Sequence, residues 1–176
     1  GYITPPAHMG PLHLTRAQRK PTGMITTGQK IAIERTKASR LPQTDLANIK
    51  FGRVFSDHML VMAYVDGAWK APGIVPFGEM QMSPATLVLH YSQTIFEGLK
   101  AYRNAHGGIN LIRPHDNIKR MNHSAHRMCM PRIPEDVFLE AMTELVKLDQ
   151  EWIPKDEDAS LYIRPFMFAS DAYIGV

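Results

Sequence analysis

From residue 51 onward, apolar and polar positions alternate with two periods, one typical of strands and one typical of helices. The dense apolar run His58–Val65 predicts a buried strand, and the Asp-Gly pair directly after it predicts a tight hairpin turn. The segments Leu99–Arg103 and Ile109–Arg113 flank the turn-forming sequence NAHGG. Apolar segments on either side of such a turn predict a second hairpin.

Three stretches predict helices. Ser83-Pro84 has the form of an N-cap followed by proline at the first helical position. The helix that it starts is expected to contain Tyr91 and Ile95 on one face and to end near 96–98, where Gly98 supplies a stop or a tight backbone position. A second helix is expected over 114–127 and a third, the most clearly amphipathic, over Glu135–Trp152.

The last apolar stretch, Leu161–Ala169, predicts a strand that Arg164-Pro165 interrupts. Proline lacks the N–H that a sheet ladder needs, so this strand is expected to be an edge strand or to carry a bulge. Mixed helices and hairpins predict an α+β domain with a largely antiparallel sheet and flanking helices.

The first 50 residues differ in charge from the rest. They hold eight Lys and Arg against two acids, whereas the remaining 126 residues hold twelve bases against fifteen acids. We expect residues 1–40 to be a basic tail, disordered or loosely docked and partly of possible cloning origin, with a short helix possible over Ile25–Ala38. Residues 41–176 are expected to form the small α+β domain.

Composition excludes some classes of protein. Hydrophobic residues make up 44% and charged residues 21%, as in ordinary globular proteins, and no apolar run is long enough to cross a membrane. The basic tail carries no nucleic-acid-binding motif, so neither nucleic acid nor a membrane is an expected partner. The single cysteine, Cys129, has apolar neighbours and is expected to be an inert buried thiol.

Few residues suggest chemistry by pattern alone. His123 and His126 lie three apart on a predicted helix, but no third ligand has suitable spacing, so solvated histidines are favoured over a metal site. No phosphate-binding loop, nucleophile elbow or pair of catalytic carboxylates is present. Arg120, which follows a hairpin, could hold a phosphate with its planar guanidinium, and an ordinary surface cation is the alternative.

Arg164 stands within an apolar strand and would need a partner if it were buried. A carboxylate ligand or an internal acid would both serve. Tyr162, two residues earlier, points to the same face of the strand and is a candidate hydrogen-bonding neighbour.

Four motifs, in order, are more specific than these patterns: FGRVFSDHML, LHYSQTIFEGLKAY, NIKRMNHSAHRMCMP and LYIRPF followed by YIGV. From about Phe51 to Val176, they resemble the N-terminal small domain of the branched-chain amino acid aminotransferases, which are fold type IV enzymes that use pyridoxal phosphate (PLP). The FGxxFxDHML segment is closer to the longer, eukaryote-like branch of that family.

The resemblance implies roles for particular residues. Arg120 matches the arginine that anchors the PLP phosphate, and Glu97 is expected to be structural. Arg164 matches an arginine associated with recognition of the substrate carboxylate. The positions that match other substrate-binding residues are Phe51, Phe96 and Tyr162 in the pocket wall, and Tyr91, Ile174, Gly175 and Val176 in elements that reach the partner subunit's active site.

The resemblance assigns no catalytic residue to this chain. In the family, the lysine that forms the Schiff base lies further along, in a second domain, and neither Lys100 nor Lys119 matches it. We therefore expect the 176 residues to be inactive alone. The intact protein is expected to be a transaminase of amino-acid biosynthesis that moves the amino group of Leu, Ile or Val to 2-oxoglutarate.

Two alternatives stay open: another fold type IV enzyme (a D-amino acid aminotransferase or an aminodeoxychorismate lyase), and a non-catalytic binding or dimerisation module. A homodimer is expected from the family. The expected location is the cytoplasm, or the mitochondrion if the Arg-rich, acid-poor tail is a transit peptide.

Overall fold

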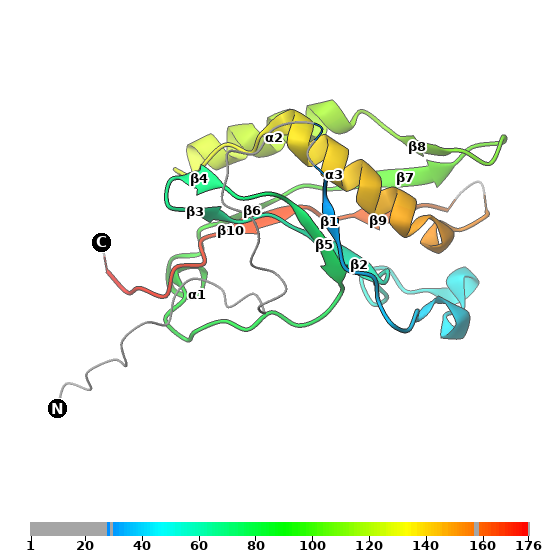
Figure 1. Cartoon of the computed structure of the whole chain (residues 1–176), viewed down its shortest axis with the longest axis horizontal. Coiled ribbons are helices and arrows are strands. Elements are labelled where there is room, and N and C mark those ends of the chain that lie inside the picture. Colours follow the sequence, from blue (N-terminus) through cyan, green and yellow to red (C-terminus); the bar gives the residue numbers. More distant parts are fainter. Residues whose placement is uncertain (1–27, 29, 157–158, 176) are drawn as a thin grey trace.

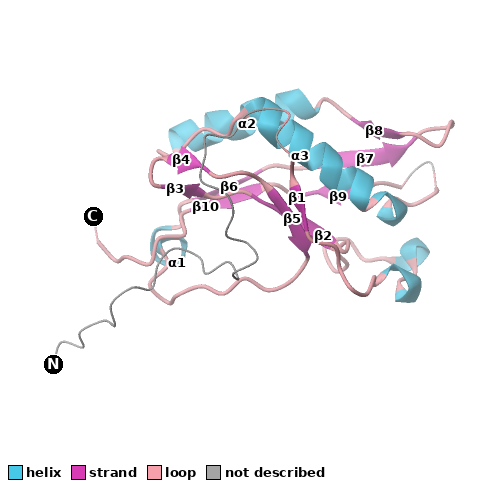
Figure 2. Cartoon of the chain, viewed as in Figure 1, coloured by secondary structure: helices cyan, strands magenta, loops and turns pink. Residues whose placement is uncertain are grey.

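The computed structural model describes residues 28, 30–156 and 159–175. Helices α2 (Pro114–Arg127) and α3 (Glu135–Leu148) lie side by side over one face of the strands, and the hairpin that spans residues 99–111 extends past the end of α3 (Figure 1; Figure 2). The strands are β1 (Ala32–Ile33), β2 (His58–Val61), β3 (Tyr64–Val65), β4 (Ala68–Trp69), β5 (Gly73–Pro76), β6 (Thr94–Phe96), β7 (Leu99–Arg103), β8 (Ile109–Leu111), β9 (Leu161–Ile163) and β10 (Phe166–Phe168). The α-helices are α1 (Leu87–Tyr91), α2 (Pro114–Arg127) and α3 (Glu135–Leu148), and short 3-10 turns are η2 (Leu41–Gln43), η3 (Leu46–Asn48) and η4 (Gln150–Trp152).

Most strand pairs are antiparallel. The sheets have the orders β1-β5-β2, β10-β6, β3-β4 and β8-β7-β9, and among the described strands only β1 with β5 is parallel. Both predicted hairpins, β3–β4 and β7–β8, are confirmed. The α+β class with a largely antiparallel arrangement is therefore as predicted from the sequence.

Strand β6 pairs with β10 and strand β7 pairs with β9, and the two pairings have the same register. Phe96 lies opposite Phe166, and Leu99 lies opposite Ile163, so two residues separate the pairs on each side. The amide of Glu97 still donates to the Pro165 carbonyl at 2.9 Å, but proline cannot return the bond. Arg164 and Pro165 therefore lie between two short strands, so the single strand predicted over Leu161–Ala169 is divided into β9 and β10. Each of these two lies at the edge of its own sheet, as one of the two alternatives had it, and no extra residue makes a bulge.

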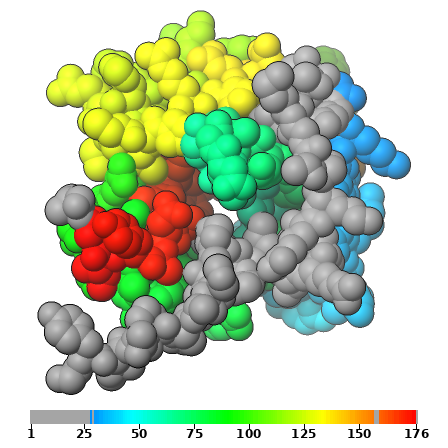
Figure 3. Space-filling view, turned by 60° about the vertical axis from the view of Figure 1, so that its left-hand side comes forward, coloured from blue at the N-terminus to red at the C-terminus, as the bar shows by residue number. Residues whose placement is uncertain are grey.

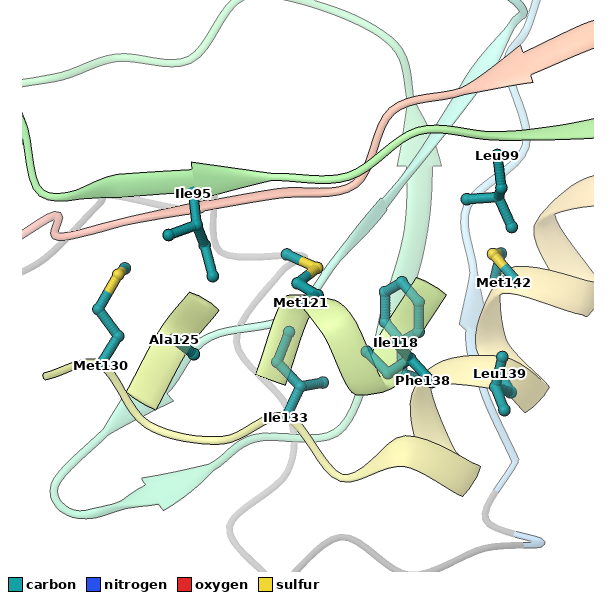
Figure 4. Close-up of a cluster of buried hydrophobic side chains, with 10 residues drawn as sticks. All are labelled: Ile95, Leu99, Ile118, Met121, Ala125, Met130, Ile133, Phe138, Leu139 and Met142. Carbon is teal, nitrogen blue, oxygen red and sulfur yellow. The ribbon is translucent and has the colours of Figure 1, made fainter. Parts of the chain in front are cut away.

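The core lies between α2, α3 and this strand pair. Figure 4 shows Ile95 and Leu99 pointing from β6 and β7 toward the two helices. The buried cluster comprises Ile95, Leu99, Ile118, Met121, Ala125, Met130, Ile133, Phe138, Leu139 and Met142. Because α2 and α3 bury their apolar faces here, the strand junction between Phe96 and Leu99 is fixed against the first half of α2.

The predicted helix through Tyr91 and Ile95 is wrong in extent. Helix α1 ends at Tyr91, where Ser92 adopts a left-handed conformation with φ of 53°. Residues 94–96 then form β6, because pairing with β10 satisfies their backbone groups. The proposed start at Ser83 is also wrong, since Ser83 forms a turn and the helix begins after Thr86.

The N-terminal helix predicted over Ile25–Ala38 is wrong for its described part. Ala32 and Ile33 form β1 beside β5, and the amide of Thr36 donates to Nε2 of His58 at 2.9 Å. Residues 1–27 lie outside the described residues. Among the described residues, no helix combines the length and apolar character needed to cross a membrane.

Cys129 is exposed, which corrects the expectation of a buried thiol. Helix α2 ends in a Schellman motif: the amide of Met130 donates to the Ala125 carbonyl at 2.8 Å, and that of Cys129 to the His126 carbonyl at 3.2 Å. Cys129 occupies the left-handed position of this motif, with φ of 53°. The turn therefore directs Met130 into the core and leaves Cys129 outside.

Candidate functional site

Four side chains from three distant segments of the sequence meet where β6 joins β7 and β9 joins β10. They are Phe51, Phe96, Tyr162 and Arg164, here called the aromatic–arginine cluster. Arg164 donates to the Tyr162 hydroxyl from Nε at 3.2 Å and from Nη2 at 2.8 Å, so the hydrogen bond expected from their spacing is confirmed. Its guanidinium carbon lies 4.5 Å from the centre of the Phe96 ring, within the range of a cation–π contact.

Phe51 completes the cluster by packing edge-to-face on Tyr162, with ring centres 5.1 Å apart. Phe51 and Phe96 nevertheless remain 76% and 64% exposed. Exposed aromatic rings that gather around a fixed guanidinium can bind an apolar group beside a carboxylate. The cluster therefore joins three separate segments of the chain, around Phe51, around Phe96 and from Tyr162 to Arg164.

Gly98 leaves room for the Tyr162 ring. A Cβ at this position would collide with the Tyr162 hydroxyl and with its ring carbon Cζ. The ring therefore sits directly against the main chain of the β6–β7 junction, and the tyrosine hydroxyl stays within reach of Arg164. Gly98 therefore does not stop the helix, which ends at Tyr91, and its contact with Tyr162 was not predicted from the sequence.

Arg120, on α2, forms a bidentate ion pair with Glu97, the residue that follows the cluster member Phe96. Nε donates to Oε1 at 2.5 Å, and Nη2 donates to Oε2 at 2.6 Å. Hydrogen bonds from Arg120 lower the pKa of Glu97 against the opposing effect of burial, with further help from Asn117 and the Gly98 amide. The same pair raises the pKa of Arg120. Both groups are therefore charged at neutral pH.

The geometry of Arg120 fits an anion such as a phosphate. A guanidinium has five N–H donors, and Glu97 accepts from two of its nitrogens. The side chain is 64% exposed, whereas that of Glu97 is 7% exposed, so the donors that face away from Glu97 lie toward solvent. A planar guanidinium held in one orientation is well suited to phosphate oxygens.

The other predicted site residues lie on two further segments, one at the end of α1 and one after β10. Tyr91 ends α1 and is 47% exposed, while Ile174 is 61% exposed. The two segments are neighbours: the amide of Leu87 donates to the Asp171 carbonyl, and that of Val88 to the Ala169 carbonyl. In Figure 3 the C-terminal residues accordingly lie against residues of the α1 region. Gly175 follows Ile174 in this segment, and Val176 lies outside the described residues.

The described residues contain no group of three or more His, Cys, Asp or Glu side chains that could hold a metal ion. His123 and His126 are exposed on α2, as predicted.

Sequence reasoning missed a second polar cluster around β2. Asp57 accepts from the Ser39 hydroxyl at 2.6 Å, the Arg40 amide at 2.9 Å and the Trp152 indole at 3.1 Å. His58 Nδ1 lies 2.6 Å from Asp149 Oδ1. The adjacent polar residues Asp57 and His58, next to the apolar run that follows them, were the feature of the sequence that could have indicated this cluster. The partners of this pair fix the start of β2, so the cluster is a structural one.

Comparison with curated proteins finds extensive similarity. The chain is 46% identical over 151 residues to "Branched-chain-amino-acid aminotransferase 2" of Bacillus subtilis, a match that covers 85% of this chain and 41% of that protein. It is 43% identical over 147 residues to the branched-chain-amino-acid aminotransferase of Mycolicibacterium smegmatis, covering 79% and 40%. The chain thus spans about two fifths of the length of these relatives. No family model matches it.

Comparison with solved structures bears on the fold. The branched-chain aminotransferase of the archaeon Thermoproteus uzoniensis, solved with norvaline, superposes with a TM-score of 0.50 at 23% identity, over 68% of this chain and 36% of that one. This likeness confirms the expected fold, that of the small domain of fold type IV aminotransferases.

Proposed function

We propose that this chain, which is a homologue of the branched-chain-amino-acid aminotransferases over most of its length, forms the N-terminal part of a transaminase that acts on Leu, Ile or Val with 2-oxoglutarate. One structural observation supports the proposal most directly. The residues that the resemblance assigns to the pocket wall, far apart in the sequence, meet in the aromatic–arginine cluster.

The cluster suits both substrates of such a reaction. The exposed rings of Phe51 and Phe96 offer an apolar surface to a branched aliphatic side chain. Arg164, held by the Tyr162 hydroxyl and the Phe96 ring, offers its remaining N–H groups to a carboxylate of the dicarboxylic partner. We assign Arg164 to carboxylate recognition and the rings to selection of the side chain.

The cofactor proposed is pyridoxal phosphate, and Arg120 is the described residue that would hold its phosphate. When bound, this group supplies the electron sink that amino-group transfer requires. Arg120 contributes binding and orientation only. The resemblance assigns no Schiff-base lysine to residues 1–176, so we propose that this stretch has no transaminase activity by itself. A borohydride-reducible cofactor band in the 176-residue chain would contradict that part of the proposal.

We further propose a homodimer in which Tyr91 and the segment from Ile174 reach the partner subunit's site. Two observations support this role: Tyr91 and Ile174 are exposed, and main-chain hydrogen bonds join the segments that carry them. In the same assembly, Phe51 and Phe96 would line the substrate pocket of the subunit to which they belong.

The activity test compares amino donors in a chain extended to the length of the relatives. Leu should exchange its amino group with 2-oxoglutarate much faster than D-Ala does. Faster exchange of D-Ala would favour a D-amino acid aminotransferase. A protein that exchanges neither and binds no cofactor would favour a binding or dimerisation module. Replacement of Arg120 by Ala should raise the dissociation constant for PLP strongly, and an unchanged constant would remove the role assigned to Arg120.

A further inference from the structure

Glu97 is a buried acid whose contacts all lead to the edge of the proposed cofactor site. Its Oε1 accepts from Arg120 Nε. Its Oε2 accepts from Arg120 Nη2, from the side-chain Nδ2 of Asn117 at 3.1 Å and from the main-chain N–H of Gly98 at 3.3 Å. The two oxygens therefore receive four N–H donors, and the carboxylate has one orientation that satisfies them all.

The main chain of Glu97 is fixed as firmly as its side chain. Its amide donates to the Pro165 carbonyl at 2.9 Å, and Asn117 also donates to the Gly98 carbonyl at 3.1 Å. The carboxylate thus stands on a strand junction that is paired on one side and bonded to α2 on the other. A rigid acceptor of this kind can set the direction of a partner that is itself largely exposed.

Arg120 needs such a partner. Its side chain is 64% exposed, and an arginine in solvent samples many rotamers, which it must give up when it binds an anion. The bidentate pair with Glu97 removes that freedom beforehand. The remaining N–H groups then face away from the carboxylate in a fixed plane.

We propose that Glu97 is a positioning residue that holds the Arg120 guanidinium ready for a phosphate ester. This inference rests on the proposed function, because it takes Arg120 to be the phosphate anchor. Glu97 has no role of its own toward substrate or cofactor. It acts through Arg120, and Asn117 supports it.

The negative charge of Glu97 is expected to weaken phosphate binding, whereas its positioning of Arg120 is expected to strengthen it. The two effects predict opposite results for Glu97→Gln, so the proposal can be tested. A carboxylate next to the anchor weakens the attraction of a dianionic phosphate. If charge alone governed binding, Glu97→Gln would tighten it. If positioning governs, the same change weakens binding, because a glutamine has only one acceptor oxygen and cannot form the bidentate pair.

The experiment measures the PLP dissociation constant by fluorescence titration in the chain extended to the length of its relatives. Glu97→Gln should raise the constant roughly tenfold, the factor that corresponds to the rotamer freedom of an arginine side chain. Glu144→Gln is the matched control, because it removes a carboxylate from the exposed pair with Lys147 on α3, where the two atoms lie 2.8 Å apart. It should leave the constant unchanged.

A double-mutant cycle separates positioning from general damage to the fold. In an Arg120→Ala background, Glu97→Gln should have no further effect on the PLP dissociation constant, since Glu97 acts only through Arg120. Asparagine at position 117 offers a milder variant: Asn117→Ala keeps the charge, loosens the carboxylate and should raise the constant less than Glu97→Gln does.

A spectroscopic arm needs no cofactor. The Nε–H proton of Arg120 should give a nitrogen-15 NMR signal protected from solvent exchange, and Glu97→Gln should abolish the protection. An unchanged or lowered dissociation constant in Glu97→Gln, additive effects in the cycle, or an unprotected Nε–H would each overturn the proposal. If instead Arg120→Ala leaves PLP binding intact, the proposed function of Arg120 itself is wrong.

Discussion

At the scale of single residues, the aromatic–arginine cluster depends on the absence of a Cβ atom at Gly98. Gly98 lets the Tyr162 ring lie against the main chain, where its hydroxyl accepts from Arg164 at 2.8 Å. Phe51 packs on the other side of the ring. The lack of a side chain at Gly98 thus leaves room for Tyr162, which contacts Arg164 and Phe51.

We predict that Gly98→Ala displaces the Tyr162 ring and disrupts the cluster. The added methyl group would collide with the hydroxyl and ring carbon, and such overpacking costs about 1–3 kcal/mol of stability. Near-UV circular dichroism and urea denaturation measure the two effects. Gly78→Ala is the control, because a Cβ there meets nothing within 4 Å. Equal behaviour of the two variants would show that Tyr162 moves without cost.

At the scale of elements, helix α3 ends against β2 through an unusual acid. Asp149 follows Leu148 at the C-terminal end, where the helix dipole disfavours negative charge. Its Oδ2 accepts from the His58 amide at 2.9 Å, and its Oδ1 lies 2.6 Å from His58 Nδ1. The His58 ring meets the Thr36 amide through Nε2, so Nε2 is the acceptor and Nδ1 carries the proton toward Asp149.

We predict that Asp149→Ala lowers the free energy of unfolding by about 3 kcal/mol, because it leaves two buried donors of His58 without a partner. Urea denaturation measures the change. Asp171→Ala, at an exposed position, should change stability by less than about 0.5 kcal/mol. A similarly small change in Asp149→Ala would mean that water replaces the carboxylate.

At the scale of the molecule, two buried carboxylates join segments that are far apart in the sequence. Glu97 joins the strand junction to α2, and Asp57 joins β2 to the segment at Ser39 and Arg40 and to η4 through Trp152. Burial would raise the pKa of Asp57, but the hydrogen bonds from the Arg40 amide, the Ser39 hydroxyl and the Trp152 indole outweigh it and lower the pKa.

We predict a loss of stability in acid that depends on these carboxylates. Their folded pKa values lie below the ordinary 3.8 for Asp57 and 4.5 for Glu97, so the stability that they add is complete above those values. It is lost as the pH falls through the lowered pKa values. Urea denaturation between pH 7 and pH 3 measures it.

Asp57→Asn provides the variant for this test. It should be less stable than the unmodified chain at pH 7 by about 1–3 kcal/mol, and the difference should shrink toward pH 3. Glu79→Gln, at an exposed position, should follow the unmodified chain across the whole range. A difference for Asp57→Asn that stays constant with pH would show that the Asp57 charge does not carry the effect.

The sequence by itself determined those features that depend on neighbours along the chain. Helix α2 begins at Pro114 and α3 at Glu135 as expected, because proline at a first turn and an apolar face of helical period are local signals. The hairpin turns followed from their Asp-Gly and Gly-Gly sequences in the same way. The cluster of Phe51, Phe96 and Tyr162 was indicated only by resemblance, since no local pattern links them.

The tertiary structure alone decided what depends on distant partners. Thr94–Phe96 became a strand because Phe166–Phe168, about seventy residues later, offers a complementary backbone edge. Cys129 turned outward because the end of α2 needs a left-handed residue at that position. Glu97 binds Arg120, 23 residues further along the chain, and this contact joins the β6–β7 junction to the proposed phosphate anchor, Arg120. Periodicity records which side of an element is buried, but it contains no information about which element lies opposite.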